Sequence, residues 1–291
     1  MTLIVTSDFE LNRVVAPSLP VAPAEYERLY QDQYSNILRL YFNRLDAILA
    51  QLETNATTAV LQVPYGSFFQ DGTTQLAAGM TNVSTTPIQV TSTDDFAPSG
   101  SLLIEQELIN YTAKTSTTFT GITRGVYGTT NVAHTTGVFV SESLGVPSPT
   151  VGQGIIFTGT SASYGIELSG TNTTRVVCTT AGVYNFAFSA QLLNFTTSED
   201  NVTVWFKKNG TDVEYSAGVV QVNSKHGGNP GAVIAAWNII INMSVTDYVE
   251  LYFSSETGNT VCSTYPAGTA PTTPISPSII LTATFVSALP A

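Results

Sequence analysis

Residues 183–193 read Val-Tyr-Asn-Phe-Ala-Phe-Ser-Ala-Gln-Leu-Leu, and this stretch decides the fold class. Its aromatic and aliphatic side chains recur at every second position, at Tyr184, Phe186, Phe188, Ala190 and Leu192. Successive side chains of a β-strand point to opposite faces, so this spacing places one apolar row on a single face. The stretch therefore predicts a half-buried β-strand.

The same alternation recurs along the C-terminal half. The further rows are Val202, Val204 and Phe206; Val249, Leu251 and Phe253; and Ile279, Leu281, Ala283 and Phe285. Asn209-Gly210, directly after the first of these rows, is a strong hairpin-turn signal. Residues 233–241 add a long apolar strand, and helical patterns are missing. About eight strands result, which predicts an antiparallel sandwich of jelly-roll type.

Composition divides the chain into four stretches. They are an extended leader at 1–21, a helix at 22–53, a small β module at 54–145 and the sandwich at 146–291. Pro17 and Pro20 disfavour a helix in the leader. Gly145-Val146-Pro147-Ser148-Pro149 is the natural linker before the sandwich. The expected fold class is mainly β with one N-terminal α-helix.

The predicted helix carries one long apolar row. Its members are Tyr30, Tyr34, Ile37, Tyr41, Leu45, Ile48 and Leu52. Their mean spacing slightly exceeds one helical turn, as in nearly straight helical bundles. A helix with so broad an apolar face needs a packing partner. We expect three copies to form a trimeric stalk; the alternative is a surface helix packed on the chain's own core.

The charge balance excludes several classes of partner. Only 11% of residues are charged, and 10 Lys plus Arg stand against 21 Asp plus Glu. Nucleic-acid binders cluster basic residues, whereas the densest basic pair here is Lys207-Lys208. The N-terminus lacks the pattern of a secretory signal, and no apolar segment approaches transmembrane length. We therefore expect neither nucleic-acid binding nor membrane insertion.

The two cysteines, Cys178 and Cys262, are too few for a disulfide framework. Assembly in a cytoplasmic compartment would keep them as buried free thiols, and pairing within one sandwich is the alternative.

Glu107, Arg124 and His134 are the candidates for acid and base chemistry. No second carboxylate or nucleophile accompanies them, and His226 lies in another region. We favour a structural interpretation, in which Glu107 and Arg124 pair to brace tight turns and His134 bonds a loop carbonyl. Sequence motifs for nucleophilic, phosphate-binding or metal-dependent catalysis are missing as well, so we expect no enzyme and no cofactor or metal.

Residues 87–140 read as short strands separated by glycines, at 87–90, 102–104, 107–111, 117–120 and 138–140. They carry an ordered set of motifs: Phe96, Ser99-Gly100, Leu102-Leu103-Ile104, Glu107, Ile109, Tyr111-Thr112, Phe119-Thr120-Gly121, Thr123-Arg124-Gly125, Gly128-Thr129-Thr130, Ala133-His134 and Gly137. In this order the motifs resemble a small β module of tailed-phage structural and fibre proteins. The resemblance implies a component of a virus particle.

The C-terminal half resembles the tumour necrosis factor and complement globular-head superfamily. The motifs are Ala-Gly-Val-Tyr-Asn-Phe at 181–186, Val-Trp-Phe-Lys-Lys-Asn-Gly-Thr-Asp-Val at 204–213, Asp-Tyr-Val-Glu-Leu at 247–251 and Pro-Ser-Ile-Ile-Leu-Thr-Ala-Thr-Phe-Val at 277–286. The resemblance implies a homotrimer with an aromatic core and axis. The aromatic residues concerned are Tyr184, Phe186, Phe188, Phe206, Phe253 and Phe285. Some family members bind calcium, but no loop with oxygen ligands is evident here.

The N-terminal part resembles predicted structural proteins of marine phages, through Leu-Pro-Val-Ala-Pro-x-Glu-Tyr at 19–26 and Gln-Tyr-Ser-Asn-Ile-Leu-Arg-Leu-Tyr-Phe at 33–42. Together the resemblances imply a homotrimeric capsid head fibre or decoration protein on the virion surface. Its leader would bind phage capsid or tail proteins by strand addition. Loops 221–230 and 255–274 would serve contact with a host-surface glycan or protein, or are plain solvated loops. A tail fibre or receptor-binding protein is the second hypothesis, and a glycan-degrading enzyme the third.

Overall fold

The computed structural model describes residues 28–58 (side chains through Leu49), 63–145 and 150–289. These residues form one α-helix and 23 β-strands, and the helix and the strands belong to two compact units. The assigned strand pairings are antiparallel. The predicted mainly-β fold with one N-terminal helix is therefore confirmed.

The helix α1 spans Arg28–Thr58, so it continues beyond the predicted end at residue 53, while its predicted start lies outside the described residues. No side chain described in α1 is fully buried. The predicted row from Tyr30 to Ile48 is half-buried, and the side chain of Leu52 lies outside the described residues. Leu29 and Phe42 stay 66% and 55% exposed. No helix among the described residues is long and apolar enough to cross a bilayer.

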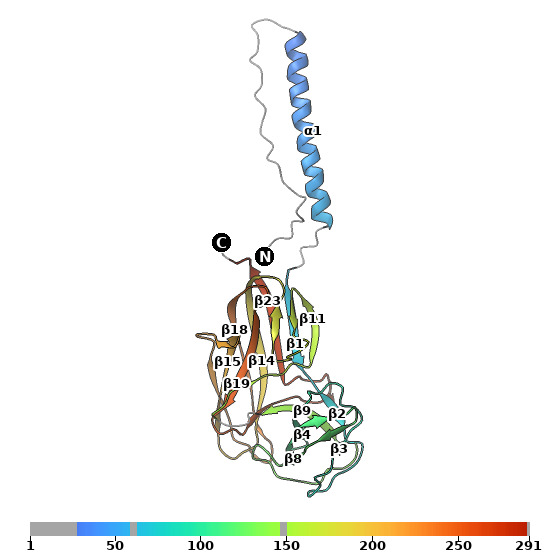
Figure 1. Cartoon of the computed structure of the whole chain (residues 1–291), viewed down its shortest axis with the longest axis vertical. Helices are drawn as coiled ribbons and strands as arrows, with labels where there is room; N and C mark the ends of the chain where they lie inside the picture. The colour runs from blue at the N-terminus through green and yellow to red at the C-terminus, as the bar shows by residue number, and fades with distance from the viewer. Residues whose placement is uncertain (1–27, 59–62, 146–149, 290–291) are drawn as a thin grey trace. The chain divides into compact units, whose positions relative to one another are not determined.

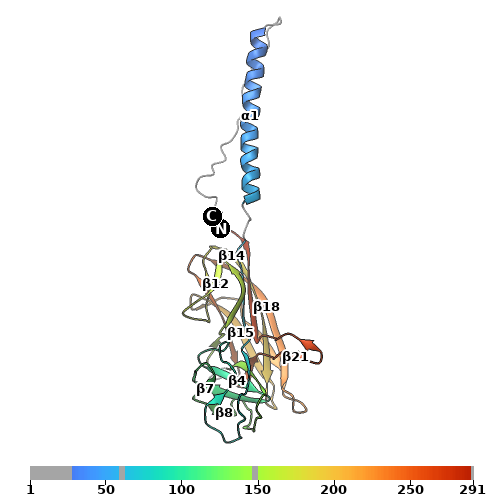
Figure 2. The same ribbon diagram turned by 90° about the vertical axis from the view of Figure 1, so that its right-hand side faces the viewer.

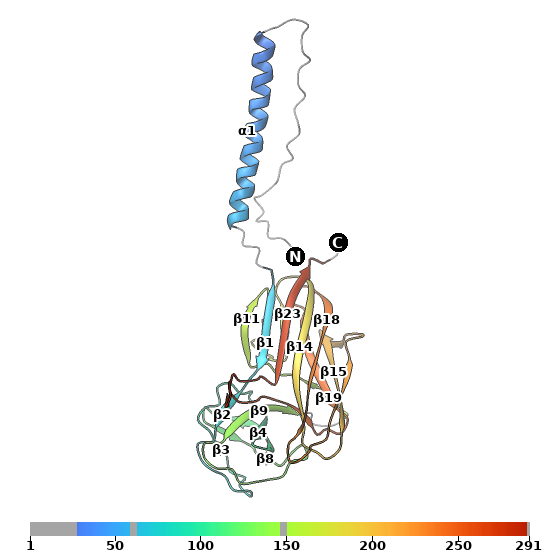
Figure 3. The ribbon, with the colours of Figure 1, turned by 180° about the vertical axis from the view of Figure 1, so that it is seen from behind.

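The larger sheet of the β unit has 11 strands, and β14 lies at its centre. Its main path runs through β11 (Gly159–Tyr164), β1 (Tyr65–Gln70), β23 (Ile279–Ser287), β14 (Gly182–Asn194), β20 (Thr260–Ser263), β9 (Phe139–Gly145), β4 (Gly100–Ile104), β5 (Glu107–Tyr111) and β8 (Thr123–Arg124). Two further strands join this path, β18 (Gly231–Met243) on β14 and β2 (Thr73–Gln75) on β9. Figure 3 shows β11, β1, β23, β14 and β18 side by side.

The second sheet has seven strands (Figure 1). It covers the part of the larger sheet that contains β11, β1, β23 and β14. Its strands are β12 (Ile166–Leu168), β13 (Val176–Cys178), β19 (Tyr248–Ser255), β15 (Asp200–Lys208), β16 (Thr211–Asp212), β10 (Gln153–Gly154) and β17 (Gly218–Val222). Small sheets are formed by β3 (Ile88–Gln89), β7 (Thr118–Thr120) and β6 (Ala113–Lys114), and by the hairpin of β21 (Gly268–Thr269) and β22 (Thr272–Thr273), which projects in Figure 2. The predicted turn Asn209-Gly210 joins β15 to β16, and both residues have positive φ as a two-residue hairpin loop requires.

The sandwich core lies between these two sheets and is rich in aromatic rings. Five of the predicted aromatic residues are buried and the sixth is half-buried: Tyr184, Phe186, Phe188, Phe206, Phe253 and, in part, Phe285. Their rings pack on one another inside a single chain. Five of these side chains are enclosed within one chain and therefore form its core. An aromatic axis between chains stays a prediction.

The β module is an insertion in the sandwich rather than a preceding domain. Its predicted range began at residue 54, yet Tyr65–Gln70 pairs with β23 and β11 within the sandwich sheet. The following strands, β2 to β9, form the module. The chain rejoins the sandwich sheet at β9, because β9 pairs with β20. The module's own core packs Phe119 against Tyr111 and Phe96, with ring centroids 4.7 and 5.0 Å apart. Since β14 pairs with both β23 and β20, one strand ties the two parts together.

Both cysteines, Cys178 and Cys262, are buried and free. Burial raises the pKa of the Cys262 thiol to about 12 and also raises that of Cys178, so both thiols stay protonated at neutral pH.

Candidate functional site

The structure brings Glu107, Arg124 and His134 together at one end of the β module. Glu107 begins β5 and Arg124 ends β8, and these strands pair with each other. Arg124 Nε donates a hydrogen bond to Glu107 Oε1 at 2.6 Å, and Arg124 Nη2 donates to Oε2. Both side chains are buried, so this two-point ion pair forms in a medium where neither charge is well hydrated.

His134 lies between two carboxylates. Its Nδ1 is 2.8 Å from Glu105 Oε2, and its Nε2 is 2.9 Å from Glu107 Oε2. The predicted contact of its side chain with a loop carbonyl is therefore replaced by two carboxylate contacts. The expectation that no second carboxylate accompanies the cluster is wrong, because Glu105 contacts His134. The backbone of His134 forms a separate bridge with Met80. Both ring nitrogens of His134 therefore contact carboxylate oxygens, and the ring positions Glu105 and Glu107.

The cluster also holds the loop that follows β8. Val132 N–H donates to Glu107 Oε2 at 3.0 Å, and Arg124 Nη2 donates to the carbonyl of Val132. Arg124 Nη1 donates to the carbonyl of Thr81 at 2.6 Å. Burial by itself raises the pKa of Glu107, but the bonds from Arg124, Val132 and His134 together lower it below its usual value. Glu107 is therefore an ionised structural carboxylate that braces turns.

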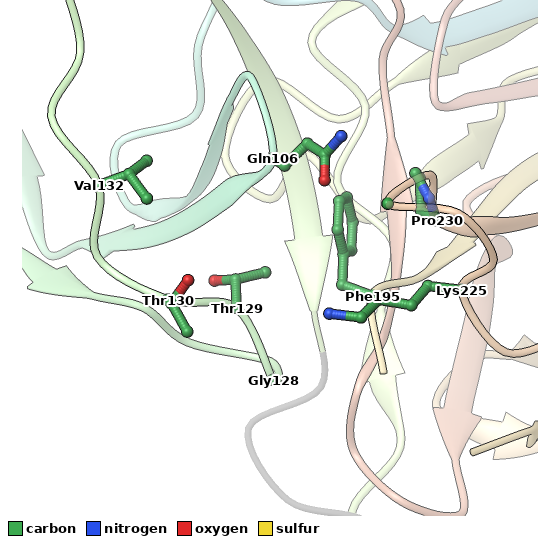
Figure 4. Close-up of a pocket in the computed structure, with 9 residues that line it drawn as sticks. Gln106, Gly128, Thr129, Thr130, Val132, Phe195, Lys225 and Pro230 are labelled. Carbon is green, nitrogen blue, oxygen red and sulfur yellow. The ribbon is translucent and has the colours of Figure 1, made fainter. Parts of the chain in front are cut away.

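The braced loop forms one wall of a pocket of about 170 Å³. Figure 4 shows this pocket between the module and the end of the sandwich. Its lining residues are Gln106, Gly128, Thr129, Thr130, Val132, Phe195, Lys225, Gly228 and Pro230. None of these residues is acidic, so the lining offers no carboxylate as a general acid, general base or metal ligand.

Two tight turns place side chains at the rim of the pocket. Glu105 has φ of 56° in the two-residue turn between β4 and β5, an unusual conformation for a residue with a side chain. This turn holds Gln106 at the pocket, while the bond to His134 anchors Glu105. On the opposite side, Gly227 and Gly228 both have positive φ and form the tip of the loop that carries Lys225.

The segment after β14 joins the two walls. Lys225 N–H donates to the carbonyl of Thr196 at 2.7 Å. On the other wall, a Cβ at Gly128 would lie 2.4 Å from Thr196 Cγ2, so only glycine permits this approach of the loop. Phe195, nearly fully buried, lies between the walls. The pocket is therefore built from three segments that are distant in the sequence.

Lys225 differs from the other basic side chains of the β unit. Within residues 63–145 and 150–289, its ammonium group forms no hydrogen bond or ion pair with the protein. Each of the other basic side chains there has a protein partner: Lys114, Arg124, Arg175, Lys207 and Lys208. Figure 4 shows the Lys225 side chain extending past Phe195 toward the loop of Thr129. The pocket therefore presents an uncompensated positive charge on an acidic protein.

A second buried carboxylate, Glu142 on β9, lies at the base of the module. Its Oε1 accepts a hydrogen bond from Ala97 N–H at 2.8 Å, and its Oε2 lacks a partner among the described residues. Burial raises the pKa of Glu142 to about 8, although the hydrogen bond from Ala97 N–H and the charge of Lys114 act to lower it. Glu142 is enclosed and opens to no described pocket, so it is a core acid held mainly in its neutral form.

Sequence reasoning identified the cluster of Glu107, Arg124 and His134 but did not predict the pocket beside it. Lys225 falls in loop 221–230, which was expected to serve surface contacts, whereas Gln106 and Phe195 carried no signal. Within the part of the chain that the structure describes, no group of three His, Cys, Asp or Glu side chains could hold a metal ion.

Compared with known proteins, the sequence matches no family model, and a search of curated proteins also finds no match.

Proposed function

We propose that this chain is a non-catalytic structural subunit of a tailed-phage virion, which assembles as a homotrimer on the particle surface. The capsid head fibre or decoration protein is the form we favour. The phage assignment rests on the sequence resemblances of the β module and the N-terminal part. An uncharged face of the larger sheet supports the homotrimer. The strand pattern of the C-terminal half supports a sandwich of the jelly-roll type.

The observation that carries this proposal is an uncharged sheet face. The strands β1, β11, β14, β18 and β23 contain no Asp, Glu, Lys or Arg. The second sheet, in contrast, carries charges on β12, β15, β16 and β19. A sheet face that met only water would not need to exclude charge along five strands, whereas the centres of protein interfaces are depleted in charge.

The outward side chains on this face are small, aliphatic or uncharged polar. On β18 the outward positions are Ala232, Ile234, Ala236, Asn238, Ile240 and Asn242. Ile234 and Ile240 are 64% and 60% exposed, although both lie in the middle of a regular strand. Apolar surface of this kind marks an interaction site. Copies of the same chain are the partners we propose, because α1 independently leaves Leu29 and Phe42 exposed.

Analytical ultracentrifugation of the full chain tests the homotrimer. We expect a mass three times 30.9 kDa at micromolar concentration. The variant Ile240→Arg places a charge on the uncharged face and should shift the β unit toward single chains without unfolding it. The matched control Val83→Arg changes an exposed aliphatic residue of the module and should leave the trimer intact. A wild-type chain that sediments as a stable single subunit would refute the homotrimer.

A tail fibre or receptor-binding protein is the second candidate, and the pocket beside Lys225 is the observation that favours it. Immunogold imaging of particles that contain this chain separates the two positions. Label on capsid facets supports the decoration protein, and label around the tail supports the adhesin. A glycan-degrading enzyme stands third, because hydrolysis would need a pair of carboxylates and the described pocket lining has none.

A further inference from the structure

We infer that the pocket lined by Gln106, Thr130, Phe195 and Lys225 binds an acidic sugar unit, that is, a single pyranose ring bearing a carboxylate. The pocket lies within one chain, so this inference does not depend on the homotrimer. It adds a ligand class to the proposed surface role.

The charge of the pocket selects an anion. The lining has one cationic side chain, Lys225, and no acidic one. The chain as a whole has a net charge of −11, so anions are repelled from most of its surface. An unpaired ammonium group in a concave site is a local exception to this repulsion, and a carboxylate is a natural partner for it.

The remaining polar groups favour a ligand with hydroxyl groups. The Gln106 amide and the Thr130 hydroxyl can each donate and accept hydrogen bonds, as sugar hydroxyls can. In the described structure neither side chain has a hydrogen-bond partner. A phosphate ion would leave the Gln106 carbonyl unmatched, because it offers chiefly acceptor oxygens. Val132, Phe195 and Pro230 add apolar surface, which suits the C–H groups of a pyranose.

The size of the pocket limits the ligand to one ring. Its volume of about 170 Å³ lies below the usual range for drug-sized ligands. About six waters would fill such a volume in the liquid. One sugar ring suits this space, whereas longer glycans would extend beyond it into solvent.

The backbone of the site is held in shape before any ligand arrives, while the side chains of Gln106, Thr130 and Lys225 lie exposed at its rim. The cluster of Glu107, Arg124 and His134 fixes the wall that carries Thr130, and the Glu105 turn fixes Gln106. Thr129 Oγ1 donates to the carbonyl of Val126 at 2.8 Å and accepts from Leu108 N–H at 3.1 Å, which fixes the same wall. Such preorganisation lowers the ordering cost of binding a small, weak ligand.

Saturation-transfer NMR on the full chain tests this inference, with glucuronate, galacturonate and N-acetylneuraminate as acidic probes and glucose and galactose as neutral ones. We expect saturable binding of at least one acidic sugar with a Kd on the order of 1 mM. The neutral sugars should bind roughly tenfold more weakly, because the charge-assisted hydrogen bond is lost. Inorganic phosphate should fail to displace the acidic sugar at an equal concentration.

Three variants tie the signal to the pocket. Lys225→Gln should weaken acidic-sugar binding roughly tenfold and bring it to the level of neutral sugars. Lys225→Arg should retain binding, and the control Lys207→Gln, on β15, should not change it. Circular dichroism confirms that each variant is folded.

Several outcomes would overturn the inference. They are the lack of saturable signal from all three acidic sugars up to about 50 mM, equal binding of acidic and neutral sugars, displacement by phosphate, or acidic-sugar binding that Lys225→Gln leaves unchanged. Each of these results would leave the sedimentation test of the homotrimer unaffected.

Discussion

Replacing Glu142 with glutamine should stabilise the protein at neutral pH and do so increasingly as the pH rises. Glu142 is almost completely buried where the β module meets the sandwich sheet. Glutamine has nearly the same shape and can still accept the hydrogen bond from Ala97 N–H. The substitution therefore removes the ionisable group and little else.

The magnitude follows from the pKa of Glu142. In the unfolded chain this carboxyl loses its proton near pH 4.5, whereas burial raises its pKa in the folded state to about 8. Between these values the folded state holds a proton that the unfolded state has released, so rising pH favours unfolding. Each pH unit between the two pKa values costs about 1.4 kcal/mol, which amounts to about 3 kcal/mol at pH 7 and about 4 kcal/mol at pH 8, where half of the folded molecules have also lost the proton.

Thermal unfolding of the wild type and Glu142→Gln, followed by circular dichroism at equal protein concentration, measures this difference. Near pH 4.5 the two curves should almost coincide. At pH 7 the variant should melt roughly 6–12 °C higher, from the dependence of Tm on stability in domains of this size. The control Glu214→Gln changes an exposed carboxylate and should follow the wild type throughout. A Tm difference that stays constant from pH 4.5 to 8 would refute the reasoning.

Three further predictions concern other residues of the β unit. Arg124→Met leaves the Glu107 carboxylate buried without its partner and should lower the free energy of unfolding by about 3–5 kcal/mol in urea titrations; an unchanged midpoint would contradict the structural role. The pKa of Glu107 is lowered in the folded state, so its ionised form contributes stability that is present above its ordinary pKa of 4.5 and is lost as the pH falls below that value. Arg124→Met should therefore show a weaker acid-induced loss of stability than the wild type. Gly128→Ala forces a methyl group into the segment behind the pocket and should destabilise the protein by about 1–3 kcal/mol in the same titration, and a neutral effect would argue against the close approach. The thiols of Cys178 and Cys262 should resist a thiol reagent in the native protein and react only in denaturant; rapid labelling of the native state would show that they are accessible.

Local patterns predicted the strands of the sandwich because their side-chain period is a property of the sequence alone. β14 and β18 follow their alternating residues, and Asn209-Gly210 turns where its two residues favour positive φ. The place of β1 could not be predicted in this way. Its partners, β23 and β11, lie far along the chain, and a six-residue strand does not reveal its partners.

The candidate site was accessible only in part for the same reason. Glu107, Arg124 and His134 are unusual residues in a chain with little charge, so they attract attention in the sequence. The pocket, however, joins Gln106 to Phe195 and Lys225 across more than a hundred positions, and the lack of a partner for Lys225 depends on all its neighbours. The uncharged sheet face likewise becomes visible only once the strand order is known.

The position of β1 has a mechanical consequence. Because Tyr65 begins a strand flanked on one side by β11 and on the other by β23, any pull transmitted along the preceding segment reaches the β unit at a strand bonded on both edges. Two ladders must then yield together before the strand can slide, whereas a strand at a free edge is held by one ladder only. A body tethered through this strand is built to resist tension at its attachment.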